Sequence, residues 1–120
     1  MSEKQMHMHM LQKSAMQVQQ HLQELDGQLE QLAHVAEGLG DFGKLTAGDE
    51  MLVPLASGIF AVAELKEKSL RVNVGAKVVV EKSADDTKKI ILDQIKDLEK
   101  VQGNLQFQLE HFMAELKKNV

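Results

Sequence analysis

The chain has 120 residues, 43% of them hydrophobic, which is enough for one domain but too few for two independent cores. Its net charge of −4 excludes a basic surface for nucleic acid or an anionic membrane, and no apolar run reaches the roughly 18 residues of a membrane-spanning helix. Cysteine is absent, which excludes disulfides, thiolate metal sites and a cysteine nucleophile, and with no apolar leader we expect a cytoplasmic protein.

Residues 1–39 carry one hydrophobic stripe in a segment otherwise rich in Gln, Glu, Lys and His. Steps of three and four residues alternate along it, as at the a and d positions of a heptad: Met8, Leu11, Ala15, Val18, Leu22, Leu25, Leu29, Leu32, Ala36 and Leu39. This pattern predicts a coiled-coil helix on the order of 50 Å long. We expect Gly38, Gly40 and Gly43 to end it, because each costs about 1 kcal/mol inside a helix.

Residues 83–120 repeat this pattern. Ser83 and Asp86 resemble a capping box, which marks a helix start. A second stripe follows, with Gln102 as its polar layer: Ile91, Ile95, Leu98, Gln102, Leu105, Leu109, Phe112 and Leu116. A helix that is apolar on one stripe cannot bury that stripe alone, so we expect the two helices to pair.

Between the helices, in residues 40–82, the period changes from that of a helix to that of a strand. The runs MLVPL at 51–55 and IFAVAEL at 59–65 are joined by a turn at 56–58, and a second hairpin turn is indicated by VGAKV at 74–78. Pro54 cannot donate to a strand ladder, which predicts an edge position or a bulge. The expected order is therefore helix, hairpin, hairpin, helix.

These elements predict a single α+β domain over 1–120, a long antiparallel two-helix coiled coil with two β-hairpins at one end. The hairpins carry more apolar side chain than one small sheet can hide, and two-stranded hairpins are marginal in water. We therefore expect the hairpins to pair with other subunits. The predicted interface comprises Leu52, Val53, Leu55, Ile59, Phe60, Val62, Val72, Val74, Val78 and Val80.

The two-hairpin segment resembles the alpha class of the prefoldin family. The resemblance rests on LVPL at 52–55 with Gly58, then VG at 74–75 and VEKS at 80–83, between two heptad helices. It implies an ATP-independent co-chaperone of the cytoplasm without cofactors. It further implies a hexamer of two alpha and four beta subunits, whose coiled-coil tips hold unfolded proteins and deliver them to a group II chaperonin. The residues leave open whether this chain assembles with beta subunits or with itself.

The stretch MHMHM at 6–10 lies where the predicted antiparallel pairing forms the distal tip. In a helix, successive residues turn by about 100°, so His7 and His9 diverge and share no metal ion, whereas an extended chain would place them together as a copper site. The predicted client-binding tip comprises Met6, Met8, Met10, Phe107, Phe112, Met113 and Leu116. Met8, Phe112 and Leu116 lie on the stripes and have ordinary seam packing as an alternative role. The other four lie off the stripes, and flexible methionine suits surfaces that accept many partners.

No pattern in the chain supports catalysis. Asp85 and Asp86 suit a helix start, His21, His34 and His111 occur singly, and the glycines at 38, 40 and 43 form no phosphate loop. We expect neither an enzyme nor a metal protein. The alternatives to a chaperone are a structural coiled-coil oligomer or filament subunit without client binding, and an adaptor whose helix seam binds one partner.

Overall fold

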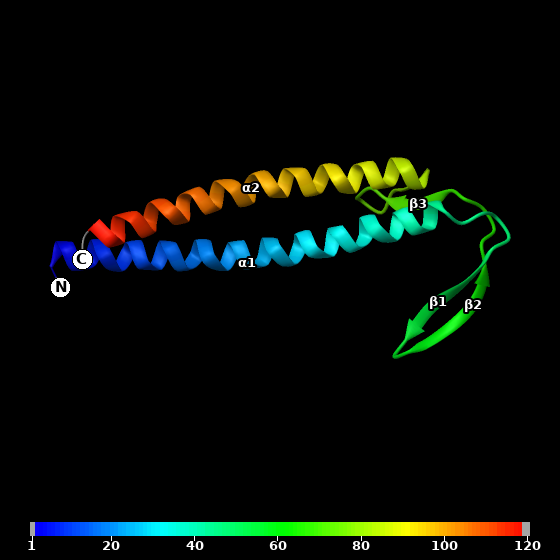
Figure 1. Cartoon of the computed structure of the whole chain (residues 1–120), viewed down its shortest axis with the longest axis horizontal. Helices are drawn as coiled ribbons and strands as arrows, with labels where there is room; N and C mark the ends of the chain where they lie inside the picture. Colours follow the sequence, from blue (N-terminus) through cyan, green and yellow to red (C-terminus); the bar gives the residue numbers. More distant parts are fainter. Residues whose placement is uncertain (1, 119–120) are drawn as a thin grey trace. The chain divides into compact units, whose positions relative to one another are not determined.

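A computed structural model describes residues 2–118, and the expected helical residues 1, 119 and 120 lie outside this range. The elements follow the expected order: α1 (Glu3–Gly43), β1 (Glu50–Ala56), β2 (Ile59–Glu64), β3 (Leu70–Asn73), β4 (Val79–Lys82) and α2 (Ala84–Lys118) (Figure 1). They form two compact units, Met1–Ala33 with Asp93–Val120, and His34–Leu92. Across the described residues, no helix combines the length and apolar character needed to cross a membrane.

Helix α1 begins at a capping box, formed by Ser2 and Gln5, that was not predicted. The amide N–H of Gln5 donates to Ser2 Oγ at 3.2 Å, and the amide N–H of Ser2 donates to Gln5 Oε1 at 3.0 Å. This cap places MHMHM inside the helix, where His7 and His9 are both exposed and point roughly 200° apart. The expected helix over this stretch is confirmed.

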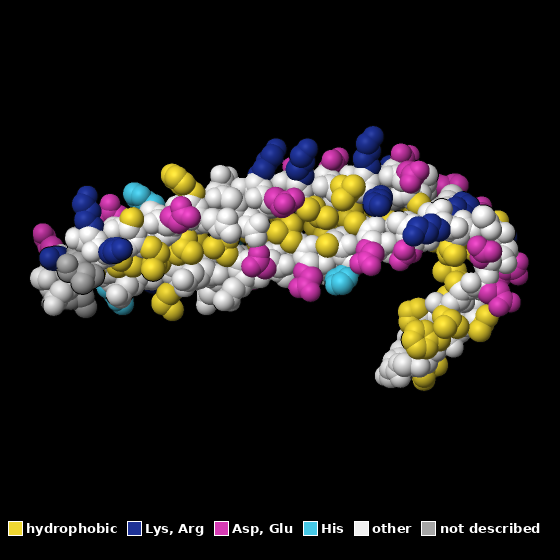
Figure 2. All heavy atoms as spheres, viewed as in Figure 1, with side chains coloured by type: hydrophobic (Ala, Val, Ile, Leu, Met, Phe, Trp, Pro, Cys, Tyr) yellow, Lys and Arg dark blue, Asp and Glu magenta, His cyan; other side chains and the backbone are white. Residues whose placement is uncertain are grey.

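In the first unit, α1 and α2 run antiparallel with their stripes facing each other (Figure 1). Every stripe position of this unit is buried or half-buried, and Ala15, Val18 and Leu25 are the least exposed. Figure 2 shows the hydrophobic side chains gathered along the line where the helices meet. At the polar layer, Gln102 Nε2 donates to Asp26 Oδ1 at 2.6 Å, so this layer is joined across the pair by a hydrogen bond.

In the second unit, α1 continues to Gly43 and does not end near residue 39 as expected. Ala36 is buried, Leu39 is half-buried, and a side chain at position 40 would have its Cβ 3.3 Å from Lys88 Nζ of α2. Gly40 thus leaves room for the Lys88 side chain.

Helix α2 begins where the sequence predicts. Ser83 Oγ accepts the amide N–H of Asp86 at 3.1 Å, which is the forward half of the expected capping box. The Ser83 carbonyl accepts both the amide N–H and the hydroxyl of Thr87, and Thr87 is the one buried polar residue among residues 2–118. Asp85 and Asp86 lie in the first turn, at the positive end of the helix dipole.

The first hairpin pairs β1 with β2 antiparallel, with Leu52 opposite Val62 and Ala56 opposite Ile59. Its turn residues Ser57 and Gly58 have φ of 46° and 78°, the two positive values of a type I′ turn. The register shifts between Pro54 and Ala56, which confirms the irregularity expected from the proline.

The second hairpin pairs β3 with β4, with Val72 opposite Val80. The expected turn at 74–78 is confirmed: the amide N–H of Val74 donates to the Val78 carbonyl at 3.0 Å. Gly75, Ala76 and Lys77 all have positive φ, which is costly for the last two because they carry a Cβ. Asn73 Oδ1 accepts the amide N–H of Gly75 at 2.9 Å and supports the turn.

Candidate functional site

The hairpins expose a surface of large apolar side chains, which we call the hairpin surface. Seven of the ten predicted interface residues are exposed: Leu52, Leu55, Ile59, Phe60, Val62, Val74 and Val78. The other three, Val53, Val72 and Val80, are half-buried. Val79 is also exposed and was missed, although its place within the run VVV at 78–80 could have indicated it.

The hairpin surface has apolar residues on both faces of the first hairpin. Residues directly opposite each other share a face, so Leu52 and Val62 lie on one face and Val53 and Ala61 on the other. Val62 is 70% exposed and Leu52 is 64% exposed. Covering one such side chain contributes about 1.5–3 kcal/mol, so this surface strongly favours a partner.

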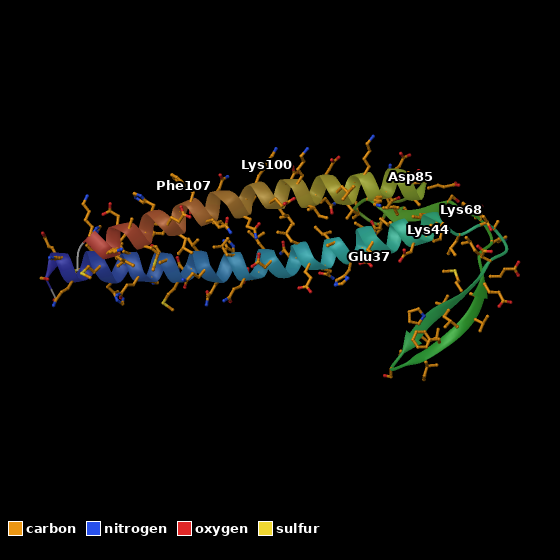
Figure 3. The ribbon with its side chains drawn as sticks, in the orientation of Figure 1. Glu37, Lys44, Lys68, Asp85, Lys100 and Phe107 are labelled. Carbon is orange, nitrogen blue, oxygen red and sulfur yellow. The ribbon has the colours of Figure 1, made fainter. Side chains whose placement is uncertain are left out.

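A lysine from the segment between the hairpins caps the C-terminal end of α1. Lys68 Nζ donates to the carbonyls of Phe42 at 2.9 Å and of Gly43 at 3.1 Å, and also to that of Leu45 (Figure 3). The same ammonium lies 5.1 Å from the centroid of the Phe42 ring. The last turn of α1 contains no basic residue, so Lys68 supplies the cation that the negative end of the helix dipole favours.

This capping contact closes a small ring at the base of the first hairpin. The amide N–H of Leu65 donates to the Asp49 carbonyl at 2.8 Å, and the amide N–H of Gly48 donates to the Leu65 carbonyl at 2.7 Å. The segment after α1 is therefore hydrogen-bonded to Leu65 at the hairpin base. Lys68 follows Leu65 in the chain and contacts the end of α1. Lys68 was not predicted as a functional residue, because nothing near it in the sequence indicates a contact with a helix end more than twenty residues away.

The tip end of the first unit contains an apolar groove, which we call the distal groove. It has a volume of about 430 Å³ and is lined by Met8, Gln12, Met113, Ala114, Leu116 and Lys117. Three predicted tip residues, Met8, Met113 and Leu116, therefore meet here. Met8 and Leu116 are half-buried stripe residues that also line this groove, whereas Met113 is 50% exposed.

The other predicted tip residues do not line the distal groove. Met6 and Met10 are exposed on the side of α1 opposite its stripe, and Phe107, at 73% exposure, lies on the side of α2 turned away from α1 (Figure 3). Phe112 lines a second groove, about 530 Å³ in volume, with Val18 and Leu105 and mostly polar neighbours. Met16, which is 63% exposed, was not predicted as a surface methionine. Its position off the hydrophobic stripe could have indicated this exposure.

The described side chains include no cluster suited to metal binding. His21 lines the second groove beside Glu24, but no three His, Asp or Glu side chains within residues 2–118 gather as a metal site would require. What the geometry offers chemically is apolar contact, on the hairpins and at the distal tip.

Two heptad helices with two apolar β-hairpins between them in the chain define a coiled-coil assembly subunit. A family model described as Prefoldin subunit matches residues 11–118. A prefoldin subunit alpha of Archaeoglobus fulgidus is 27% identical over 109 residues, covering 90% of this chain and 80% of that protein. A cryo-EM structure of filamentous PFD from Methanocaldococcus jannaschii has a similar fold, with a TM-score of 0.78, 20% identity and 92% of each chain covered.

The chain belongs to the prefoldin family, and the archaeal relative supports its alpha class. The fold expected from the sequence, two long helices with two antiparallel hairpins, is confirmed. Membership in this family, whose members are non-enzymatic, supports a chaperone-type role and assembly with other prefoldin subunits.

Proposed function

We propose that this chain is a subunit of an ATP-independent co-chaperone that holds unfolded proteins by apolar contact at its distal tip. The observation that carries this proposal is the distal groove, which is lined by the exposed Met113; Met6 and Met10 add exposed methionines on the other side of α1, within the same stretch of the helix. Methionine is unbranched and polarizable, so one surface of this kind adapts to many client sequences.

Holding would depend on several weak contacts acting together. One groove of about 430 Å³ takes only a few side chains of a client, which is too little for tight binding. An oligomer presents several tips to the same unfolded chain, and their common platform raises the effective concentration of each tip. No nucleotide or metal is needed for this mechanism, and we expect no catalysis.

The hairpin surface is our candidate for the platform. We propose that it pairs with hairpins of prefoldin beta subunits, as two alpha and four beta subunits, or with further copies of this chain. In the cytoplasm, such an assembly would pass its clients to a group II chaperonin. The support for this assembly is the row of exposed apolar residues on otherwise marginal two-stranded hairpins.

The test is suppression of aggregation of a chemically denatured protein by the assembled oligomer. Met6, Met10, Phe107 and Met113 are all changed to Ser, and we expect suppression to fall at least several-fold. Helicity and oligomer mass should be nearly unchanged, because exposed substitutions usually alter stability by about 0.5 kcal/mol or less.

The matched control changes Leu92 and Val101 to Ser, since both are exposed apolar residues of α2 away from the tip. We expect this control to suppress aggregation as the parent does. Equal loss in both variants would show a general apolar effect and contradict a tip site. Loss of helicity in the four-residue variant would assign those residues to packing.

A filament subunit without client binding is the second candidate. The observation that favours it is the similar fold of the M. jannaschii protein, whose structure is described as filamentous. Electron microscopy of the purified chain, with and without a beta subunit, separates the candidates: filaments combined with no aggregation suppression would favour this second function.

A further inference from the structure

We propose that Met113 is the site of a reversible oxidative switch: its thioether reacts with hydrogen peroxide, and the resulting sulfoxide weakens the binding of unfolded proteins in the distal groove. This inference rests on the proposed client binding at the tip. It adds a chemical modification that regulates this binding, and it specifies the residue, the oxidant and the product.

Methionine carries the sulfur chemistry of this chain. The sequence contains seven methionines and no cysteine, tryptophan or tyrosine. Cysteine thiolates are common targets of peroxides, but here the thioethers are the sulfur groups that a peroxide meets. Methionine sulfoxide is reduced back to methionine by dedicated enzymes, so the modification is reversible.

Accessibility divides the methionines of residues 2–118 into two groups. The exposed group comprises Met6 at 53%, Met10 at 66%, Met16 at 63% and Met113 at 50%. The half-buried group comprises Met8 and Met51. Because a peroxide must reach the sulfur atom itself, we expect the exposed group to react first.

The position of Met113 separates it from the other exposed methionines. Of these four, Met113 is the one that lines the distal groove, where the half-buried Met8 is its neighbour. A groove that is open to the side chains of a client is also open to a small oxidant. The same thioether is therefore available both for client contact and for oxidation.

The reaction transfers one oxygen atom from the peroxide to the thioether. A lone pair on the Met113 sulfur attacks one oxygen of hydrogen peroxide, and the S–O bond forms as the O–O bond breaks. The departing hydroxide takes the proton from the transferred oxygen and leaves as water. The sulfur is oxidised by two electrons and the peroxide is reduced by two, so the two reactants supply every atom.

The sulfoxide changes what the distal groove can bind. It converts a flexible apolar side chain into a polar one, and covering a polar group with an apolar client costs free energy. Gln12 and Lys117 also line this groove, and both side chains can donate hydrogen bonds to a sulfoxide oxygen. Lys117 lies four residues after Met113, on the same side of α2. These donors stabilise the oxidised groove in water, whereas an apolar client gains nothing from them.

Oxidation of Met113 should leave the helix pair intact. Met113 lies next to the stripe residue Phe112 but off the stripe itself, so its side chain is not part of the packing between the helices. Met8 is a half-buried stripe residue, and oxygen on its sulfur would disrupt that packing. Because Met8 is less exposed, peroxide should convert Met113 first, and the switch then acts on binding and not on folding.

The experiment treats the assembled oligomer with hydrogen peroxide, removes the peroxide with catalase, and then adds a chemically denatured protein. Peptide mass spectrometry measures the sulfoxide at each methionine, and light scattering measures aggregation. We expect sulfoxide at Met113 before Met8, and a several-fold loss of aggregation suppression with helicity and oligomer mass unchanged. Treatment with both methionine sulfoxide reductases, one for each sulfoxide epimer, should restore suppression.

Three variants are each compared with themselves before and after peroxide. Met113→Leu keeps an apolar side chain of similar volume but has no thioether, so peroxide should leave its suppression unchanged. Met16→Leu is the matched control, because Met16 is similarly exposed but does not line the distal groove, and this variant should lose suppression as the parent does. A variant with both Met6→Leu and Met10→Leu should also remain sensitive to peroxide.

A several-fold loss of suppression in oxidised Met113→Leu would overturn the proposal. Protection by Met6→Leu and Met10→Leu instead, full suppression by a parent oligomer with sulfoxide at Met113, loss of helicity, or failed recovery with the reductases would each do the same. The variant with four serines separates this inference from the proposed function. If that variant loses suppression while peroxide has no effect, the client tip stands and the switch fails. If it suppresses aggregation as the parent does, both fail.

Discussion

Replacing Lys68 with Met tests whether a single ammonium holds the base of the first hairpin against the end of α1. The methionine keeps most of the apolar stem but removes the ammonium, which donates three hydrogen bonds and lies over the Phe42 ring. Hydrogen bonds to a charged group contribute about 1.5–3 kcal/mol each when buried. Because Lys68 is half-buried and water can reach the exposed Gly43, we expect a total loss of about 1–3 kcal/mol.

The assays are urea unfolding followed by circular dichroism, and amide exchange over residues 44–49 and 65–69. We expect faster exchange at Gly48 and Leu65 in Lys68→Met, because their hydrogen bonds close the same ring. Lys68→Arg keeps the charge and should recover part of both effects. Lys66→Met, which alters an exposed lysine of the same segment, is the control. If Lys68→Met and Lys66→Met behave alike in both assays, the capping role is refuted.

Three further predictions concern the hairpins and the helix pair. Changing Val74 and Val78 to Asp should dissociate the oligomer, because unpaired charges are costly to bury, and light scattering would measure the lower mass. An unchanged mass would show that neither residue lies in the interface. Gln102→Leu should raise the free energy of unfolding by about 1 kcal/mol in urea titration, since a polar stripe residue reduces stability even when it is bonded to Asp26. A free energy of unfolding below that of the parent would mean that the hydrogen bond contributes more than burial of the leucine. Ala76→Gly should stabilise the chain by about 0.5–1 kcal/mol in thermal unfolding, because the φ of Ala76 is 48°, and destabilisation would contradict strain in this turn.

The helices and the hairpin turns could be predicted because local chemistry alone specifies them. The heptad spacing from Met8 to Leu39 matches the period of a helix, and every residue of that stripe is buried or half-buried. Ser57 and Gly58 supply the positive φ values of a tight turn, and Pro54 produces the expected irregularity because it has no N–H.

Contacts between residues distant in the sequence could not be predicted in this way. Gly40 of α1 lies close to the Lys88 side chain of α2, and the C-terminal cap of α1 comes from Lys68. Such contacts depend on where the chain returns in space, which no local period encodes.

In the candidate site too, some features could be predicted from the sequence and others could not. Sequence alone determined that the off-stripe residues Met6, Met10, Phe107 and Met113 would be exposed, because a single stripe leaves the rest of each helix uncovered. Only the tertiary structure decided which of them meet: Met113 joins Met8 and Leu116 in the distal groove, whereas Phe107 points away from α1. The physical reason is that burial follows from the period within one helix, but a groove requires side chains from two helices, and its lining depends on the alignment of the pair.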